Sequence, residues 1–312
     1  MAHYLVTGGA GFIGSHLVEE LLRRGEKVRI LDNFSTGKRE NVDAFAGRIE
    51  LIEGDIRSHH IVREAVDGVD FVLHQGALPS VPRSINDPIT TNEVNVTGTL
   101  NVLDAAKDAG VKRVVYASSS SVYGPDPELP VREGMNPNPV SPYAVAKLTG
   151  EKYCHAFSKV YGLETVALRY FNIFGPGQDP KSQYSAFIPL FVVGMMEGQA
   201  LTIHGDGLQA KDFTYVSNVV EANLLAAVAE GVSGEVFNVG CGASTSVNEV
   251  VGHIRKIIGA EGNITYGPAR AGDVPQSLAA IDRAQEKLGY EPRVLIEEGL
   301  QRVALWFRRG GK

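Results

Sequence analysis

Tyr143 and Lys147 lie four residues apart in a segment with the composition of a helix start, SPYAVAK at 141–147. A capping Ser, an early Pro and the helix formers that follow predict a helix here, with both side chains on one face. An ammonium group beside a phenol favours the phenolate, so we expect a lowered pKa for Tyr143 and a role as general base. In isolation, the same spacing is also typical of a surface pair.

Gly8, Gly11 and Gly14 follow directly on the apolar run 4–7. A Gly-rich triplet alone also fits a flexible turn. Between a strand and a helix, however, Gly8 and Gly11 would let the backbone turn tightly and approach a pyrophosphate, while Gly14 would let the helix pack closely on the strand. The diphosphate would then lie at the helix N-terminus, where free N–H groups favour negative charge. The segment therefore predicts a dinucleotide-binding turn.

Asp32 ends the next apolar run, roughly 20 residues further on, where an acid can accept hydrogen bonds from both ribose hydroxyls of a dinucleotide. Its carboxylate would repel a 2′-phosphate, so NAD is predicted rather than NADP. A helix cap or a turn acid is the other interpretation of this residue. Asp55, after the third run, is a candidate contact for the adenine, although Gly54-Asp55 is equally typical of an ordinary turn.

Short β-branched runs alternate with helical patterns through the first half of the chain. This rhythm predicts an α/β fold with a doubly wound, Rossmann-type parallel sheet and a ligand crevice at the carboxyl ends of the strands. The predicted strands are 4–7, 28–31, 49–52, 71–74, 114–117 and 166–168. Apolar stripes at helical spacing lie between them: Ile13, Leu17 and Leu21 in one helix, and Val96, Leu100 and Leu103 in another.

The rhythm loosens after about residue 172, where Pro and Gly clusters occur at 175–177 and 205–207. We therefore expect an NAD-binding domain at 1–171 and a smaller substrate-binding lobe at 172–312. Segments near 212–240 are expected to return to the first domain. No long linker separates the two parts, so they are expected to pack closely.

Composition excludes several classes of protein. Of 312 residues, 44% are apolar and 21% are charged, the balance of a globular protein with a sizeable core. A net charge of −6 with dispersed basic residues argues against nucleic-acid binding. Cys154 and Cys241 are far apart, so neither a disulfide framework nor a metal site is predicted. No signal peptide or membrane span follows Met1, which predicts a cytoplasmic protein.

Four consecutive serines, Ser118 to Ser121, follow the fifth predicted strand, where hydroxyl groups would project into the crevice or merely form a polar turn. With this cluster, nearly the whole chain closely resembles the extended short-chain dehydrogenase/reductase family. The resemblance rests on GGAGFIGS at 8–15, the tract 32–37, SSSSVYG at 118–124, YAVAK at 143–147, RYFNIFGP at 169–176 and the tract 205–216.

Within that family the chain is most similar to the UDP-sugar 4-epimerases, particularly those that accept N-acetylated hexoses. The resemblance implies Ser119, Tyr143 and Lys147 as catalytic residues and a homodimer as the assembly. Ser120 and Ser121 stand where the related sugar 4,6-dehydratases carry an Asp-Glu pair. Hydroxyl groups do not readily replace the acid and base that remove water, so this departure argues against dehydration.

The resemblance also implies two sets of binding residues. The cofactor set is Gly8, Gly11, Phe12, Ile13, Asp32, Asn33, Ser35, Thr36, Gly37, Asp55, Ile56, Gln75, Ala77, Asn95, Tyr143 and Lys147. The UDP-sugar set is Ser80, Arg83, Ser119, Ser120, Tyr143, Asn172, Ile188, Lys211, Arg270, Asp273 and Ser277. For Arg270 and Ser277, a solvent-exposed position without a part in recognition is the alternative. Ser277 would otherwise lie beside the C2 substituent of the sugar and leave room for an acetamido group.

Three residues depart from the family pattern: Lys211 replaces a usual Arg, and Asn218 and Ala280 each replace a usual Asp. The activity implied is inversion at C4 of a UDP-hexose or UDP-N-acetylhexosamine through a 4-keto sugar, with NAD tightly bound and not consumed. Another nucleotide-sugar enzyme is the first alternative, namely a 4,6-dehydratase, a reductase or a UDP-uronate 4-epimerase. A non-catalytic, NAD-sensing regulator is the remote one.

Overall fold

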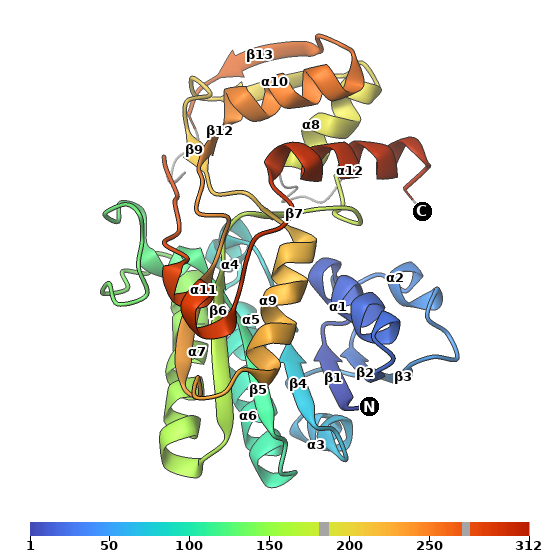
Figure 1. The fold of residues 1–312 in the computed structure, drawn as a ribbon, viewed down its shortest axis with the longest axis vertical. Helices are drawn as coiled ribbons and strands as arrows, with labels where there is room; N and C mark the ends of the chain where they lie inside the picture. Colours follow the sequence, from blue (N-terminus) through green and yellow to red (C-terminus); the bar gives the residue numbers. More distant parts are fainter. Residues whose placement is uncertain (181–186, 270–274, 312) are drawn as a thin grey trace.

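Seven parallel strands form the main sheet, in the order β3-β2-β1-β4-β5-β6-β11 (Figure 1). This is a computed structural model, and it describes residues 1–180, 187–269 and 275–311. The order confirms the predicted doubly wound α/β fold. The strands are β1 (His3–Thr7), β2 (Lys27–Asp32), β3 (Glu50–Glu53), β4 (Phe71–His74), β5 (Arg113–Ser119), β6 (Glu164–Tyr170) and β11 (Glu235–Val239).

Five of the six predicted runs lie wholly within the first six strands, and the third is displaced by one residue, since β3 begins at Glu50 rather than at Ile49. The seventh strand, β11, was not predicted as a strand, and it pairs with β6 from far along the chain. The chain order reverses between β1 and β4, so the connections leave these two strands in opposite directions. A crevice at their carboxyl ends is the usual ligand site of such a sheet.

Helices cover both faces of the sheet and bury two apolar layers against it (Figure 1). One layer holds α1 (Phe12–Arg23), α9 (Val216–Val228) and α11 (Asp282–Leu288). The other holds α3 (His59–Val66), α6 (Gly98–Asp108) and α7 (Pro142–Tyr161). The short helices are α2 (Glu40–Asp43), α4 (Val81–Asn86), α5 (Pro88–Asn92) and the 3₁₀ turn η2 (Ser120–Tyr123).

The helix before β5 differs from the predicted one. A π turn, η1 (Glu93–Thr97), joins α5 to α6, and a π turn widens the helix by one residue. The polar Asn95 is the buried residue of this turn, whereas Val96 of the predicted stripe stays partly exposed. Leu103 is fully buried as expected. The stripe prediction was therefore wrong at Val96, because it assumed an uninterrupted α-helical period.

A second lobe lies beyond the carboxyl ends of the strands and has its own apolar core (Figure 1). Its helices are α8 (Phe187–Met196), α10 (Val247–Ile258) and α12 (Ile296–Arg308), and its strand pair is β8 (Ala200–His204) with β13 (Asn263–Gly267). Two shorter pairs are β7 (Ile173–Phe174) with β10 (Thr214–Tyr215), and β9 (Ala210–Lys211) with β12 (Thr245–Ser246). Across the three described stretches, no helix has the length and apolarity to cross a membrane.

Candidate active site

The turn from β1 into α1 has no room for a side chain at Gly8 or Gly14. Gly8 has φ +69°, and a Cβ there would lie 2.8 Å from the nitrogen of Gly76. A Cβ at Gly14 would lie 2.1 Å from the carbonyl oxygen of Gly8. The carboxyl ends of β1 and β4 therefore meet the start of α1 as bare backbone. Gly11 caps α1, and the first turn carries no acidic residue, so its N–H groups suit an anion such as a diphosphate.

Asp32 lies at the end of β2 and is only 7% exposed. Its carboxylate accepts hydrogen bonds from the backbone N–H groups of Ala10 at 2.9 Å and Phe34 at 2.8 Å. These bonds fix the carboxylate between the glycine turn and the next loop. A carboxylate has about four acceptor sites, so Asp32 keeps the capacity to bind the hydroxyl groups of a ribose. The residues present fit the adenosine half of NAD.

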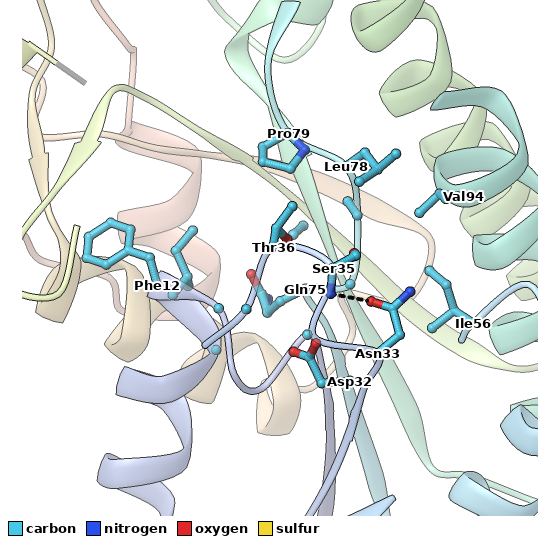
Figure 2. Close-up of a pocket in the computed structure, with 18 of the residues that line it drawn as sticks. Phe12, Asp32, Asn33, Ser35, Thr36, Ile56, Gln75, Leu78, Pro79 and Val94 are labelled. Atoms are coloured by element: carbon cyan, nitrogen blue, oxygen red, sulfur yellow. Dashed lines mark hydrogen bonds between the residues drawn. The ribbon is translucent and has the colours of Figure 1, made fainter. Parts of the chain in front are cut away.

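The loop after β2 continues this wall of the site. The side-chain oxygen of Asn33 accepts the backbone N–H of Ser35 at 3.0 Å (Figure 2), and its amide donates to Asp55 at 2.8 Å. The guanidinium of Arg57 beside Asp55 holds the pKa of that carboxyl at about 2. Asp55 is therefore ionised at neutral pH, and it is already paired with Arg57.

A first cavity of about 590 Å³ opens at the carboxyl ends of β1, β2 and β4, with Phe12 and Ile56 on opposite sides and Asp32 between them (Figure 2). This volume lies within the usual range for small-molecule sites. Of the expected cofactor set, every residue except Asn95 lines it: Gly8, Gly11, Phe12, Ile13, Asp32, Asn33, Ser35, Thr36, Gly37, Asp55, Ile56, Gln75, Ala77, Tyr143 and Lys147. Ser80 and Arg83 of the UDP-sugar set also line the first cavity.

Two further features of the first cavity bear on ligand binding. Asn95 lies behind its wall, where its side chain accepts the N–H of Leu78 at 2.7 Å and donates to the carbonyl oxygen of Leu78 at 3.0 Å. Gln178, which sequence reasoning missed, lines the cavity and donates to the carbonyl oxygen of Ile173. Its buried side-chain oxygen has no hydrogen-bond partner within the described structure. Such an orphaned acceptor is consistent with a ligand that donates a hydrogen bond.

The Tyr143 and Lys147 side chains both face the first cavity from α7. The helix starts as predicted, since the Ser141 hydroxyl accepts the N–H of Ala144. The Lys147 ammonium donates a 2.8 Å hydrogen bond to the carbonyl oxygen of Ala117 and lies 5.9 Å from the centre of the Tyr143 ring. The ammonium is thus fixed at the end of β5, beside the phenol.

The protonation behaviour of this pair differs from the expectation. Burial raises the pKa of Tyr143, and the hydrogen bond with Ser119 only partly opposes it. Burial lowers the pKa of Lys147 to about 8. The expectation that the Tyr143 pKa is lowered was therefore wrong, because burial has the largest effect on the pKa of this phenol.

The serine cluster divides between two roles. Ser118 lines the first cavity and donates to the carboxylate of Glu151. Ser119 interacts with Tyr143, and its hydroxyl donates to Ser121 at 3.1 Å. Ser120 begins η2, and neither Ser119 nor Ser120 lines a described cavity. Of the cluster, Ser119 is thus the hydroxyl that contacts the tyrosine.

Glu151 is a buried acid beneath the site that sequence reasoning missed. It forms a bidentate ion pair with Arg169 at 2.7 and 2.8 Å, and both side chains are at most 4% exposed. It lies four residues after Lys147, on the same face of α7. That spacing was the available signal, since a charged residue on a core-facing stripe usually has a buried partner.

A second cavity of about 300 Å³ lies in the second lobe and is lined by Asn172, Ile188 and Lys211 of the expected UDP-sugar set. Ser277 borders this region through Asn172, whose amide donates to the Ser277 hydroxyl at 2.9 Å. The backbone N–H of Asp212 donates to the same hydroxyl at 3.2 Å. Arg270 and Asp273 lie outside the described residues.

Asp212 is a further buried acid that the sequence did not single out. Its carboxylate accepts the backbone N–H groups of Cys241 at 2.7 Å, Gly242 at 3.0 Å and Ala279 at 3.2 Å. Burial raises its pKa to about 6 despite these bonds. Asp212 therefore ties the loop after β11 to the segment that carries Ser277.

Residues 4–240 match the NAD dependent epimerase/dehydratase family. The chain belongs to this family. The UDP-glucose 4-epimerase of Mycolicibacterium smegmatis is 37% identical to it over 308 residues, covering 97% of this chain and 98% of the relative. The UDP-N-acetyl-alpha-D-glucosaminuronate decarboxylase of Bacillus cytotoxicus is 35% identical over 316 residues, covering 97% of each. Relatives of this chain within the family thus differ in their reactions.

Two solved structures of the family are closely similar. The UDP-glucose 4-epimerase of Thermotoga maritima, solved with UDP-glucose, has 37% identity and a TM-score of 0.94, covering 99% of this chain and 100% of its own. The UDP-N-acetylglucosamine 4-epimerase of Methanobrevibacter ruminantium, solved with UDP-N-acetylmuramic acid, has 38% identity and a TM-score of 0.94, covering 99% of each chain. This chain is accordingly an enzyme of the NAD dependent epimerase/dehydratase family.

Two of its departures from the epimerase pattern lie away from both cavities. Asn218 accepts the N–H groups of Arg293 and Val294 and donates to the Val294 carbonyl oxygen at 2.7 Å. An ionised Asp could not supply that last bond. Ala280 is buried and bonds through its backbone to Val131 and Asn238. Both residues act in packing, so among the three departures only Lys211 faces a cavity.

Proposed function

We propose that this enzyme inverts C4 of a UDP-hexose or UDP-N-acetylhexosamine through a transient 4-keto sugar, with NAD bound throughout. The observation that carries the proposal is the meeting of Tyr143, Lys147 and Ser119 at the end of β5, beside a cavity that fits a dinucleotide. The similarity to two 4-epimerases over nearly the whole chain supports it.

The protein's part in the reaction is proton transfer and positioning. When bound, NAD supplies a group that takes and returns hydride. The Tyr143 hydroxyl, once ionised, accepts the proton of the sugar's 4-hydroxyl, and Ser119 hydrogen-bonds the same oxygen. Lys147, fixed by the carbonyl oxygen of Ala117, holds positive charge beside the phenolate.

Inversion requires that the sugar present both faces to the same catalytic groups. The 4-keto sugar is expected to turn about its diphosphate before C4 is reduced again, so the cycle produces no net oxidation. Ser80 and Arg83 of the first cavity and Asn172 of the second are proposed contacts for the sugar and the diphosphate. The homodimer stays a prediction, to be checked by light scattering of the purified protein.

The serines of η2 favour epimerisation over the rival reactions. A 4,6-dehydratase needs an acid and a base beside C5 and C6, and Ser120 and Ser121 provide neither. The intact Tyr143, Lys147 and Ser119 set also argues against a non-catalytic NAD sensor, which would have no need of it. A uronate epimerase, a reductase and a decarboxylase are separated by their products.

The test is incubation of the purified protein with UDP-glucose, UDP-N-acetylglucosamine and UDP-glucuronic acid in separate reactions. Expected products are C4 epimers of unchanged mass from the first two substrates, without added NAD. NAD should appear in the supernatant when the protein is denatured. Loss of water, loss of carbon dioxide or stoichiometric formation of NADH would overturn the proposal, and so would an absence of any bound nucleotide.

A further inference from the structure

A chain of buried hydrogen bonds connects β1, β4 and α6 behind the first cavity. His74, at the end of β4, is 1% exposed, and its ring lies between two buried hydroxyl groups. Its Nδ1 lies 2.7 Å from Oγ1 of Thr7, and its Nε2 lies 3.0 Å from Oγ1 of Thr99. Nothing in the proposed reaction uses this histidine, although it directly precedes Gln75 of the cavity wall.

The partners of the two hydroxyl groups determine where the protons lie. Thr99 donates its hydroxyl proton to the carbonyl oxygen of Asn95 at 2.7 Å, so it must accept from His74, and Nε2 carries a proton. Thr7 accepts the backbone N–H of Gly76 at 3.0 Å, which leaves its own proton for Nδ1. Every donor then meets an acceptor if His74 is neutral and protonated at Nε2.

The surroundings of the ring favour the neutral form as well. Burial, together with the nearby positive charge of Lys147, lowers the pKa of His74 to about 3. The Tyr116 ring lies 5.8 Å away, measured between ring centres, and burial keeps its phenol protonated by raising its pKa. A charged His74 would place a second cation near Lys147 and would leave the Thr7 proton without this acceptor.

Both ends of the chain of bonds hold the same wall of the first cavity. At one end the Thr7 hydroxyl accepts the N–H of Gly76. At the other end the Asn95 side chain hydrogen-bonds both the N–H and the carbonyl oxygen of Leu78. The segment 75–80, which leads into the predicted substrate residues Ser80 and Arg83, lines the cavity along its whole length. Ser80 has φ +95°, a strained value for a residue other than glycine, so this conformation needs support from its neighbours.

We propose that His74 is a positioning residue, which as a neutral Nε2–H imidazole between Thr7 and Thr99 sets the geometry of the segment 75–80 against the cofactor and substrate. It touches no ligand and acts through Gly76 and Leu78. The inference rests on the proposed function only for its kinetic readout. The protonation state and the binding of NAD can be measured without reference to the reaction.

The first measurement is the ¹⁵N spectrum of histidine-labelled protein, with His74 assigned by comparison with His74→Gln. We expect a neutral ring protonated at Nε2 from about pH 5.5 to about pH 8.5. An imidazolium in that range, or a proton on Nδ1, would overturn the inference. The tautomer is read from the spectrum of the wild type, and His74→Gln serves only to assign the signal.

The second measurement compares three threonine variants. Thr99→Val keeps the shape but removes the acceptor for His74, whereas Thr99→Ser keeps the hydroxyl. Thr165→Val is the matched control: Thr165 is equally buried and donates to the carbonyl oxygen of Cys154 at 2.7 Å, but it lies near the amino end of β6, whereas the first cavity lies at the carboxyl ends of the strands. All three are measured for NAD affinity, for KM and kcat, and for urea unfolding.

We expect Thr99→Val to bind NAD about tenfold more weakly, the effect of one buried hydrogen bond, and to raise KM for the UDP-sugar more than it lowers kcat. Thr99→Ser should restore both values, and Thr165→Val should lose stability without losing affinity. Unchanged NAD affinity and KM in Thr99→Val would refute the positioning role. A wild type that binds no NAD would instead refute the proposed function.

Discussion

The Lys147 ammonium lies 5.9 Å from the centre of the Tyr143 ring, and it donates its hydrogen bond to the carbonyl oxygen of Ala117 rather than to the phenol. Lys147 therefore acts on Tyr143 through space, as a charge fixed on the end of β5. Burial raises the Tyr143 pKa, so the phenol favours its neutral form, whereas Lys147, with a pKa lowered to about 8, stays largely protonated at neutral pH. The ionised phenol must be stabilised when ligands are bound.

Tyr143→Phe removes the proposed base and nothing else from the cavity wall. We predict that turnover falls by at least about 10²-fold, the usual contribution of a general base, while NAD affinity stays within a factor of about two. The measurements are kcat for UDP-glucose and NAD released on denaturation. Near-normal turnover would show that another group takes the proton.

Asp32→Ala tests whether Asp32 recognises the adenosine ribose of the cofactor. The variant loses the acceptor for the ribose hydroxyls and the charge that would repel a 2′-phosphate, so NAD should bind more weakly and NADP relatively better. The Asp32 carboxylate also binds the backbone of Ala10 and Phe34, so Asp32→Asn is the appropriate companion variant. It keeps part of that anchoring without the charge. An unchanged preference for NAD in both variants would mean that another residue reads the ribose.

Ser277→Tyr tests the sugar specificity. We predict that the wild type converts both plain and N-acetylated UDP-hexoses, and that the added ring excludes the acetamido group, because a packed pocket does not absorb extra atoms without strain. The Ser277 hydroxyl accepts bonds from Asn172 and Asp212, so Ser277→Ala controls for their loss. The quantity measured is the ratio of kcat/KM for UDP-N-acetylglucosamine and UDP-glucose. If the ratio changes equally in Ser277→Ala and Ser277→Tyr, the change in specificity comes from the lost hydrogen bonds rather than from the volume of the side chain at position 277.

Glu151→Gln tests the buried ion pair. The variant leaves the Arg169 guanidinium without its counter-charge in the core, and breaking a buried pair in this way costs about 3–5 kcal/mol of unfolding free energy. The matched control is Arg132→Gln, which removes the exposed pair with Asp282 and should cost less than about 1 kcal/mol. Urea unfolding of the two variants gives the comparison. Equal losses would mean that the Glu151–Arg169 pair contributes no more than a surface pair.

The pH dependence of stability should carry a contribution from His74. The pKa of His74 is about 3 in the folded protein, below the ordinary value of 6.5. Between these two pH values, His74 therefore binds a proton in the unfolded chain but not in the folded one. The stabilisation is complete above pH 6.5 and is lost as the pH falls, by about 1.4 kcal/mol per unit for this one group. Asp212, with a pKa raised to about 6, contributes the opposite slope between pH 6 and 3.8. The measurement is the unfolding free energy of the wild type minus that of His74→Gln, a difference in which the contributions of Asp212 and of the other shared groups cancel. A difference that does not change between pH 7 and pH 5 would contradict the prediction.

The sequence predicted what depends on short stretches of chain. The glycine turn, the strand-end Asp32 and the start of α7 at Ser141 each involve a few consecutive residues. The strands and the α/β fold were predicted from the spacing of apolar residues along the chain. The roles assigned to the site residues, and the boundary between 1–171 and 172–312, stay predictions.

The features that were missed depend on contacts between distant segments. Glu151 contacts Arg169, and Asp212 contacts the backbone of Ala279. Asn95 was expected in the cofactor set, but its place behind the cavity wall, in a π turn, was not predicted. The error on the Tyr143 pKa has the same origin. Spacing showed a nearby ammonium but not that burial raises the pKa of the phenol.

The late arrival of β11 in the chain has a consequence for synthesis on the ribosome. Residues of the second lobe, including α8 and β8, emerge after β6 and before the strand that pairs with it. Until residues 235–239 have left the exit tunnel, β6 presents an unpaired backbone edge, which is a template for association with other nascent chains. The interval between the emergence of β6 and that of residues 235–239 is therefore one in which this edge is open to association.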